Sequence, residues 1–142
     1  MIIGIAFLVV ILDQVVKYIV QHSMELGQTI PLIPHVFHLT YILNPGAAFG
    51  ILANQSWIFL LVALVFVAFF VYRKRMEMTP LYFQAAIGML LGGTLGNAID
   101  RLRLHAVVDF FDFRIWPIFN VADIAICCGI ALILLFYWRR AE

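Results

Sequence analysis

The stretch "VVDFFDFRIWPIFNVAD", residues 107–123, decides how the rest of the chain is interpreted, because it holds three carboxylates among aromatic residues. An apolar run follows it almost to the C-terminus. Asp109 lies in "VVDFF", which is too apolar for an ordinary solvated loop, and Asp123 begins the apolar run. A charge at membrane depth costs free energy, so each ionisable group there suggests a functional site.

The composition is that of a membrane protein. Of 142 residues, 65% are hydrophobic and only 12% are charged, whereas soluble domains are about half apolar and a quarter charged. A net charge of +1 leaves no basic face for phosphates, which argues against a nucleic-acid partner and favours membrane lipids. The adjacent Cys127 and Cys128 suit neither a disulfide nor a spaced metal site, and we predict that they are small buried packing residues.

Four segments are predicted to cross the bilayer, since about 20 apolar residues span roughly 30 Å of hydrocarbon. They are residues 2–20, 56–72, 81–99 and 121–138. The first lacks a basic leader and a cleavage site, so we expect it to be retained. The segment "HVFHLTYIL", residues 35–43, is rich in β-branched and aromatic residues and predicts a small sheet. The third span carries Gly88, Gly92 and Gly96, a spacing that allows close helix packing.

The distribution of Lys and Arg predicts the orientation, because short cytoplasmic loops are enriched in both. Residues 21–55 contain neither, whereas the segments "RKRMEMTP" and "WRRAE" contain five. Both termini are therefore predicted to be cytoplasmic, with residues 21–55 and 100–120 outside. Three arginines oppose this orientation, and acidic neighbours are expected to hold them; the arginines are Arg101, Arg103 and Arg114, and the neighbours are Asp100, Asp109 and Asp112.

Two polar groups in the spans have both structural and functional interpretations. Asp13 and Lys17 have i, i+4 spacing and are predicted to pair on one helix face, mainly as a structural brace, with Lys17 reaching toward the outer interface. "GNAIDR" closes the third span with Asn97, Asp100 and Arg101, where helix capping and a functional role are equally open.

The pair Asp109 and Asp123 is the strongest candidate for chemistry. Two carboxylates in a low-dielectric site do not both ionise easily, so their pKa values separate and supply one acid and one base. The alternative for Asp123, which follows Asn120 closely, is that it only caps a helix N-terminus.

Other catalytic constellations find little support. The chain has two serines, Ser23 and Ser56, and no G-x-S-x-G motif. It has no H-E-x-x-H motif, and His35 and His38 have no carboxylate near them in sequence, so neither a metal nor a cofactor is expected. A proton relay or transporter would need carboxylates through the membrane depth, and a noncatalytic scaffold would leave the buried aspartates without a purpose.

Five motifs in order, "LDQVVK", "NPGAAFG", "GNAIDR", "VVDFFDF" and "FNVAD", cover residues 12–123. With them the chain resembles the lipoprotein signal peptidases (signal peptidase II), intramembrane aspartic proteases of bacteria. The resemblance implies an all-α membrane fold of four transmembrane helices with a small extracytoplasmic β-cradle, in a single domain over residues 1–142. The family commonly has glycine where this chain has His105, a departure that concerns the turn at 104–106 and not the aspartates.

The resemblance implies that Asp109 and Asp123 are the catalytic pair. The resemblance also implies supporting or substrate-contacting roles for Asp13, Asn44, Gly46, Asn97, Asp100, Arg101 and Asn120. We add Lys17 to these residues because it is the predicted partner of Asp13. One aspartate would activate water as a general base, and the other, protonated, would polarise the scissile carbonyl. Which aspartate is the base stays open.

The implied activity is removal of the signal peptide from diacylglyceryl-modified prolipoproteins, with cleavage before the lipidated cysteine. It would take place at the outer face of the bacterial cytoplasmic (inner) membrane, in a multi-pass protein that needs no cofactor. The resemblance also implies inhibition by cyclic-peptide antibiotics such as globomycin, and we expect a monomer.

Overall fold

The computed structural model describes residues 1–46, 61, 65 and 80–141. The helices and strands of this part of the chain are α1 (Ile2–Ser23), β1 (Thr29–Ile33), β2 (Phe37–Asn44), α3 (Leu81–Leu104), β3 (Val107–Asp112) and α4 (Val121–Ala141). Three of the predicted spans coincide with α1, α3 and α4. The predicted span at residues 56–72 lies outside the described residues, except for positions 61 and 65.

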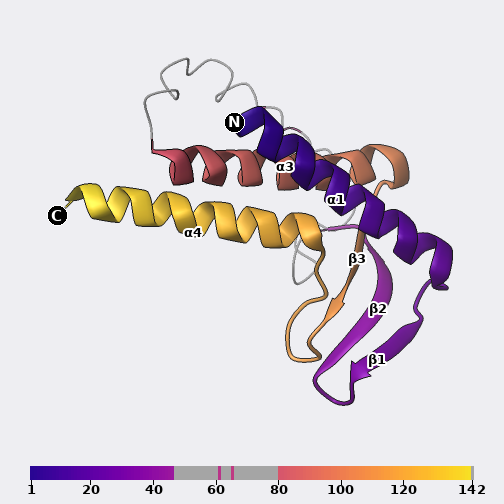
Figure 1. The fold of residues 1–142 in the computed structure, drawn as a ribbon. Coiled ribbons are helices and arrows are strands. Elements are labelled where there is room, and N and C mark those ends of the chain that lie inside the picture. The colour runs from indigo at the N-terminus through magenta and orange to yellow at the C-terminus, as the bar shows by residue number, and fades with distance from the viewer. Residues whose placement is uncertain (47–60, 62–64, 66–79, 142) are drawn as a thin grey trace.

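The helices lie alongside one another, and the sheet projects from one end of them (Figure 1). At that end α1 and α3 finish and α4 begins. The connection that follows α1 and the connection between α3 and α4 therefore meet there, as the predicted topology requires of two segments on one side of a membrane.

The sheet has three antiparallel strands in the order β1-β2-β3. Its register pairs Thr29 with Thr40 in the first ladder and Asn44 with Val107 in the second. The prediction of a strand at 35–43 is confirmed, with the observed strand running from Phe37 to Asn44. A core cluster joins the sheet to the end of α1; it consists of Val20, Met24, Tyr41, Val108 and Phe110.

Glycines let α3 approach both of its neighbours. A Cβ atom on Gly92 would lie 2.6 Å from the Ala6 carbonyl oxygen of α1, and one on Gly93 would collide with the Ala122 carbonyl oxygen of α4. A Cβ on Gly96 would lie 2.6 Å from Asp13 Oδ2. The predicted close packing is confirmed, and it is what brings polar groups of α1 and α4 against the same stretch of α3.

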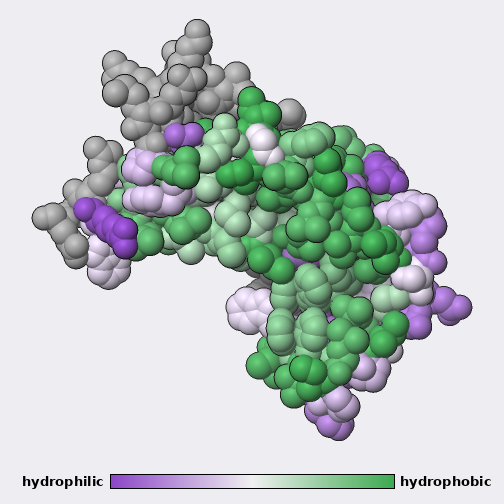
Figure 2. All heavy atoms as spheres, viewed as in Figure 1, coloured by the Kyte–Doolittle hydropathy of each residue, from purple (hydrophilic) through white to green (hydrophobic). Residues whose placement is uncertain are grey.

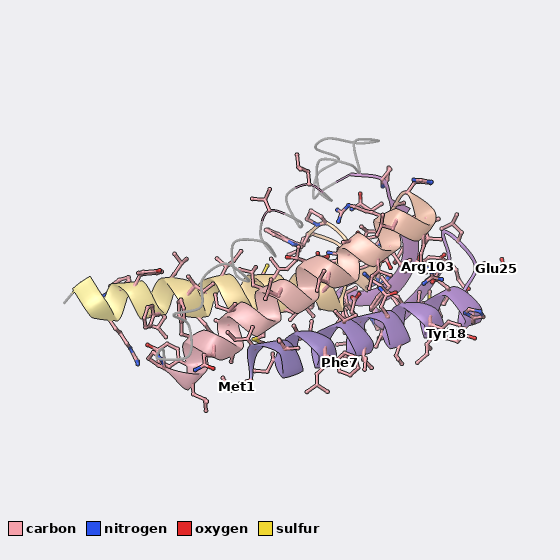
Figure 3. The ribbon with its side chains drawn as sticks, turned by 90° about the horizontal axis from the view of Figure 1, so that it is seen from above. Met1, Phe7, Tyr18, Glu25 and Arg103 are labelled. Carbon is pink, nitrogen blue, oxygen red and sulfur yellow. The ribbon has the colours of Figure 1, made fainter. Side chains whose placement is uncertain are left out.

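The helices expose apolar side chains and bury several charged and polar ones. Ile3 and Phe7 are 84% and 63% exposed, whereas Asp13 and Lys17 are 0% and 1% exposed. On the face in Figure 2, apolar residues cover the length of the helices and hydrophilic residues gather mainly toward the ends. Figure 3 shows Phe7 and Tyr18 pointing away from the other helices. Such an exterior is stable in lipid rather than in water.

Two helices of the described part of the chain are long and apolar enough to cross a bilayer. They are Ile2–Ser23 and Val121–Arg139. The helix α3, at the predicted span 81–99, is not one of these two, and the segment 56–72 is described only at positions 61 and 65. The number of spans in the whole chain therefore stays a prediction.

The prediction that Cys127 and Cys128 are buried is wrong, since both are exposed. At this level of α4 the smaller Ala125 and Gly129 form the buried face, and a Cβ on Gly129 would lie 2.7 Å from the Ala86 carbonyl oxygen. The cysteines consequently face a cavity instead of α3.

Candidate active site

Strand β3 carries Asp109 into the interior. Its neighbours Val108 and Phe110 belong to the core cluster, and Asp109 itself is 2% exposed. Two amide groups donate hydrogen bonds to its carboxyl group: Asn44 Nδ2 to Oδ2 at 3.0 Å and Asn120 Nδ2 to Oδ1 at 2.6 Å. Both oxygens of a buried acid therefore have partners.

The N-terminus of α4 carries Asp123. Its backbone N–H donates to Asn120 Oδ1 at 2.9 Å, and the Asn120 N–H donates to Asp123 Oδ2 at 3.1 Å. This reciprocal arrangement is a capping box, which begins the helix. Asp123 Oδ1 also accepts from Asn97 Nδ2 at 2.9 Å. Asp123 thus caps the helix, as the alternative interpretation expects. It is also hydrogen-bonded to Asn97, a buried polar side chain of α3.

The two aspartates interact electrostatically. Burial, followed by repulsion from the Asp123 carboxylate, raises the pKa of Asp109 to about 7, although hydrogen bonds from Asn44 and Asn120 and the charge of Lys17 act in the opposite direction. The carboxyl group of Asp109 is therefore poised to hold or release a proton near neutral pH.

Lys17 is buried among polar side chains, so the prediction that it reaches the outer interface is wrong. Its ammonium contacts Asp13 Oδ2 and Asp100 Oδ2, each at 2.8 Å, and donates to Asn97 Oδ1 at 2.9 Å. Three acceptors in the interior satisfy the three N–H groups of an ammonium, which removes the reason to extend toward water. The predicted pairing with Asp13 is confirmed.

Asp100 connects α3 to other elements and does not cap the helix, whose C-cap is His105. Its Oδ2 accepts the backbone N–H of Val108 at 3.1 Å, and its Oδ1 accepts from Gln14 Nε2 at 3.0 Å. Asp100 thereby joins α3 to β3 beside Asp109. Sequence reasoning missed Gln14, although it stands inside "LDQVVK", because a single glutamine in an apolar helix has no distinctive spacing.

Arg101 and Gly46 lie at the edge of the site. The Arg101 guanidinium donates to the carbonyl oxygens of Asn97 and Gly46, both at 3.4 Å. The Gly46 N–H donates to Asn44 Oδ1 at 3.0 Å, which turns the amide nitrogen of Asn44 toward Asp109. The remaining two predicted supporting residues therefore adjoin the acidic pair.

Asp112 lies apart from the pair. It accepts from Thr40 Oγ1 at 2.7 Å and from Arg114 Nη1 at 2.8 Å. Burial acts to raise its pKa, but the hydrogen bonds from Thr40 and Arg114 together hold the pKa below its ordinary value. The expected pairing of Arg114 with an acidic neighbour is confirmed, and Asp112 stabilises the turn after β3.

A cavity of about 600 Å³ opens beside the two aspartates. Its polar lining comes from residues already described and from Thr94. The rest is mostly apolar, and the cavity is lined by Asn44, Gly46, Thr94, Asn97, Arg101, Val107, Asp109, Trp116, Pro117, Ile118, Phe119, Asp123, Ile124, Ile126, Cys127 and Cys128. A site with two acids at one wall and apolar side chains around it suits an apolar chain with a reactive carbonyl.

A model of the family described as signal peptidase (SPase) II matches residues 5–139. A lipoprotein signal peptidase of Halothermothrix orenii is 41% identical over 138 residues, which cover 97% of this chain and 95% of that protein. One of Moorella thermoacetica is 45% identical over 133 residues, covering 91% and 87%.

Two solved structures described as bacterial membrane enzymes have the same fold. They superpose with TM-scores of 0.91 and 0.83, each at 38% identity. The first match covers 99% of this chain and 89% of the other, and the second covers 96% and 91%.

Proposed function

The chain belongs to the signal peptidase II family, and we propose that Asp109 and Asp123 are its catalytic dyad. As a lipoprotein signal peptidase it is a protease of the membrane that removes signal peptides from prolipoproteins. The main support for this assignment is that both aspartates line one cavity and that the charge on Asp123 helps to raise the pKa of Asp109 to about 7.

Asp123 is the general base in the resting enzyme. Its carboxylate lies at the N-terminus of α4 and accepts hydrogen bonds from Asn97 Nδ2 on Oδ1 and from the Asn120 N–H on Oδ2. Asp109, with its raised pKa, is the protonated partner. Asp123 takes a proton from water, the hydroxyl oxygen bonds to the scissile carbonyl carbon, and Asp109 donates its proton to the carbonyl oxygen.

The resulting tetrahedral intermediate collapses when the C–N bond breaks. The leaving amine takes the proton held by Asp123, and the oxygen returns its proton to Asp109 as the carbonyl reforms. Both aspartates then regain their starting states, so the cycle consumes one water and needs no cofactor. The three asparagines around the pair, Asn44, Asn97 and Asn120, keep their N–H groups directed at the carboxyl oxygens.

The substrate is a diacylglyceryl-modified prolipoprotein, cut just before the lipidated cysteine. The apolar lining of the cavity, with Trp116 and Ile124 among its residues, supports this, since acyl chains and a signal peptide are both apolar. Membrane lipids are the other partners.

The enzyme lies in the bacterial cytoplasmic membrane as one monomeric domain with four spans, a cytoplasmic N- and C-terminus, and an extracytoplasmic cradle formed by the sheet. Support comes from the common end of the helices at which the sheet lies (Figure 1) and from the basic residues Arg139 and Arg140 at the opposite end of α4. Inhibition by globomycin-type cyclic peptides would follow from occupation of the same cavity.

The dyad is tested with Asp109→Asn, Asp123→Asn, the double variant and Asp112→Asn, each purified in detergent and checked by thermal unfolding. Turnover of a lipidated peptide should fall by at least about 10²-fold to 10⁴-fold in either single variant, since each removes the acid–base cycle. The double variant should be hardly worse than the worse single one, because the pair acts as a unit.

Asp112→Asn is the matched control, because Asp112 bonds to Thr40 and Arg114 outside the cavity. It should keep most of the activity. A well-folded Asp109→Asn or Asp123→Asn protein with near wild-type turnover would show that the dyad is assigned wrongly. So would an Asp112→Asn loss as large as theirs.

A further inference from the structure

Each of the three asparagines around the dyad has its amide oxygen on a group that only donates hydrogen bonds. Asn44 Oδ1 faces the Gly46 N–H, and Asn120 Oδ1 faces the Asp123 N–H. Asn97 Oδ1 faces the Lys17 ammonium at 2.9 Å. An ammonium and a backbone N–H cannot accept, so each contact fixes which end of the amide points at the carboxyl groups.

Asn97 is the one whose orientation depends on a charge. Turning its amide round would point the NH₂ group at the Lys17 ammonium and the amide oxygen at Asp123 Oδ1, which now accepts from Nδ2 at 2.9 Å. Both new contacts would be repulsive. The other donor to Asn97 Oδ1 is the neutral amide of Asn120 at 3.1 Å. Of the two hydrogen bonds that fix the orientation of the Asn97 amide, the one from Lys17 is therefore the charge-assisted one.

The side chain of Lys17 is buried and its ammonium is held by three contacts. It is 1% exposed, and its contacts to Asp13, Asp100 and Asn97 lie between 2.8 and 2.9 Å. Lys17 is not part of the cavity lining, whereas Asn97 and Asp123 are. It therefore acts on the reaction through Asn97 and through its charge, without touching the substrate.

We propose that Lys17 is a positioning residue of the reaction: it locks the amide of Asn97 so that Nδ2 donates to Asp123, and it thereby orients the general base toward water. This inference rests on the proposed dyad. Asp13 serves as the counterion that holds Lys17 on α1, and Asp100 holds it from α3.

The charged groups around the dyad come from α1, α3 and α4. Lys17 contributes a positive charge from α1, and Arg101 contributes another from α3. Asp13 and Asp100 lie against Lys17, and Asp123 faces Asp109 from α4. Because the charge of Lys17 lowers the pKa of Asp109, removing that charge moves the titration of Asp109 to higher pH.

The test measures kcat, KM and the pH–rate profile of Lys17→Met with a lipidated peptide. We expect kcat to fall by about 10-fold to 100-fold, the order that misplacement of a catalytic group costs, with KM near the wild-type value. The profile should also shift to higher pH. If the single variant does not fold, Asp13→Asn/Lys17→Met takes its place for the kcat and KM comparison, since it removes one anion with the cation.

A double-mutant cycle with Asn97→Ala tests the route of the effect. If Lys17 acts through Asn97, adding Lys17→Met to Asn97→Ala should lower kcat only slightly further. Arg103→Met is the matched control; Arg103 is an exposed cation in the last turn of α3, and its removal should change neither kcat nor the profile.

The proposal is overturned by an unchanged kcat in folded Lys17→Met, by a loss that appears in KM instead, or by a profile that is scaled down without a shift. Fully additive losses with Asn97→Ala would also overturn it. The Asp109→Asn and Asp123→Asn proteins are assayed alongside: if they are inactive while Lys17→Met is normal, only the positioning role fails, and if they are active, the dyad fails.

Discussion

Asp109 combines two properties that oppose each other. Burial and the neighbouring Asp123 raise its pKa to about 7, which makes it a useful acid at neutral pH. The same surroundings make its ionised form costly. A buried carboxyl of this kind reduces the stability of the folded protein once it loses its proton.

The stability of the protein should therefore depend on pH through Asp109. The folded-state pKa of about 7 lies above the unfolded value of about 3.9, so between these values the folded chain keeps a proton that the unfolded chain has lost. This contribution to stability is complete below about pH 4 and is lost as the pH rises through about 7. Wild type should lose more thermal stability between about pH 5 and 8 than Asp109→Asn, which has no such proton.

Asp112→Asn is the control for this measurement. Because the pKa of Asp112 is lowered in the folded state, its contribution is present above the unfolded pKa and is lost only in more acidic solution. Removing Asp112 should leave the change in melting temperature between pH 5 and 8 as in wild type. Identical changes in wild type and Asp109→Asn would contradict the assigned titration.

At the level of single residues, sequence reasoning located the acidic pair but not its connections. Asp109 and Asp123 stand out because a carboxylate in an apolar segment is costly. The interior position of Lys17 was mispredicted, because spacing along α1 shows the pair with Asp13 but not the arrival of Asp100 and Asn97 from α3. Partners that come from a distant helix leave no local pattern.

Among the elements, α3 ends at Leu104, directly before the residue that departs from the family pattern. His105 has φ 56°, in the left-handed region, and its N–H donates to the Arg101 carbonyl at 3.1 Å. Glycine is the usual residue for such a helix end, because it has no Cβ to clash. The chain therefore keeps the turn at 104–106 and tolerates some backbone strain in it.

His105→Gly should relieve this strain and raise the free energy of unfolding by roughly 1 kcal/mol, given a cost of about 1 to 2 kcal/mol for an L-residue in this region. Thermal unfolding in detergent measures the change. His105→Ala is the matched variant, since it removes the same imidazole but keeps the Cβ. A glycine variant no more stable than the alanine variant would show that the backbone at this position is unstrained.

The prediction of elements was successful where a pattern is local. Spans and the strand of "HVFHLTYIL" follow from runs of apolar or β-branched residues, and the structure has α1, α3, α4 and β2 in those places. Strands β1 and β3 were not assigned individually, because β3 is almost entirely buried and β1 is exposed throughout, so neither alternates. The prediction that the cysteines are buried failed for a similar reason, because composition does not reveal which face of α4 meets a cavity.

For the whole molecule, an apolar surface is combined with a buried group of polar side chains. Exposed apolar side chains such as Ile3 and Phe7 favour lipid, and the hydrogen-bonded cluster around Lys17 is shielded from it. The polar side chains link α1, α3 and strand β3 of the sheet. A peptide bond that is to be hydrolysed near lipid needs both water and acids, and the proposed dyad would supply the acids at this junction.

The orientation of the molecule in the membrane is tested by labelling in intact cells. Cys127 and Cys128 are first replaced by alanine, because both are exposed and would react. A single cysteine is then introduced at Gln28, just before β1, or at Met78 in the basic segment. An impermeant maleimide should label the first position and not the second, since basic segments stay in the cytoplasm.

Permeabilised cells should show labelling at both positions, which controls for reactivity. Labelling at Met78 but not at Gln28 in intact cells would place the sheet and the aspartates on the cytoplasmic side, where a precursor already carried across the membrane could not reach them.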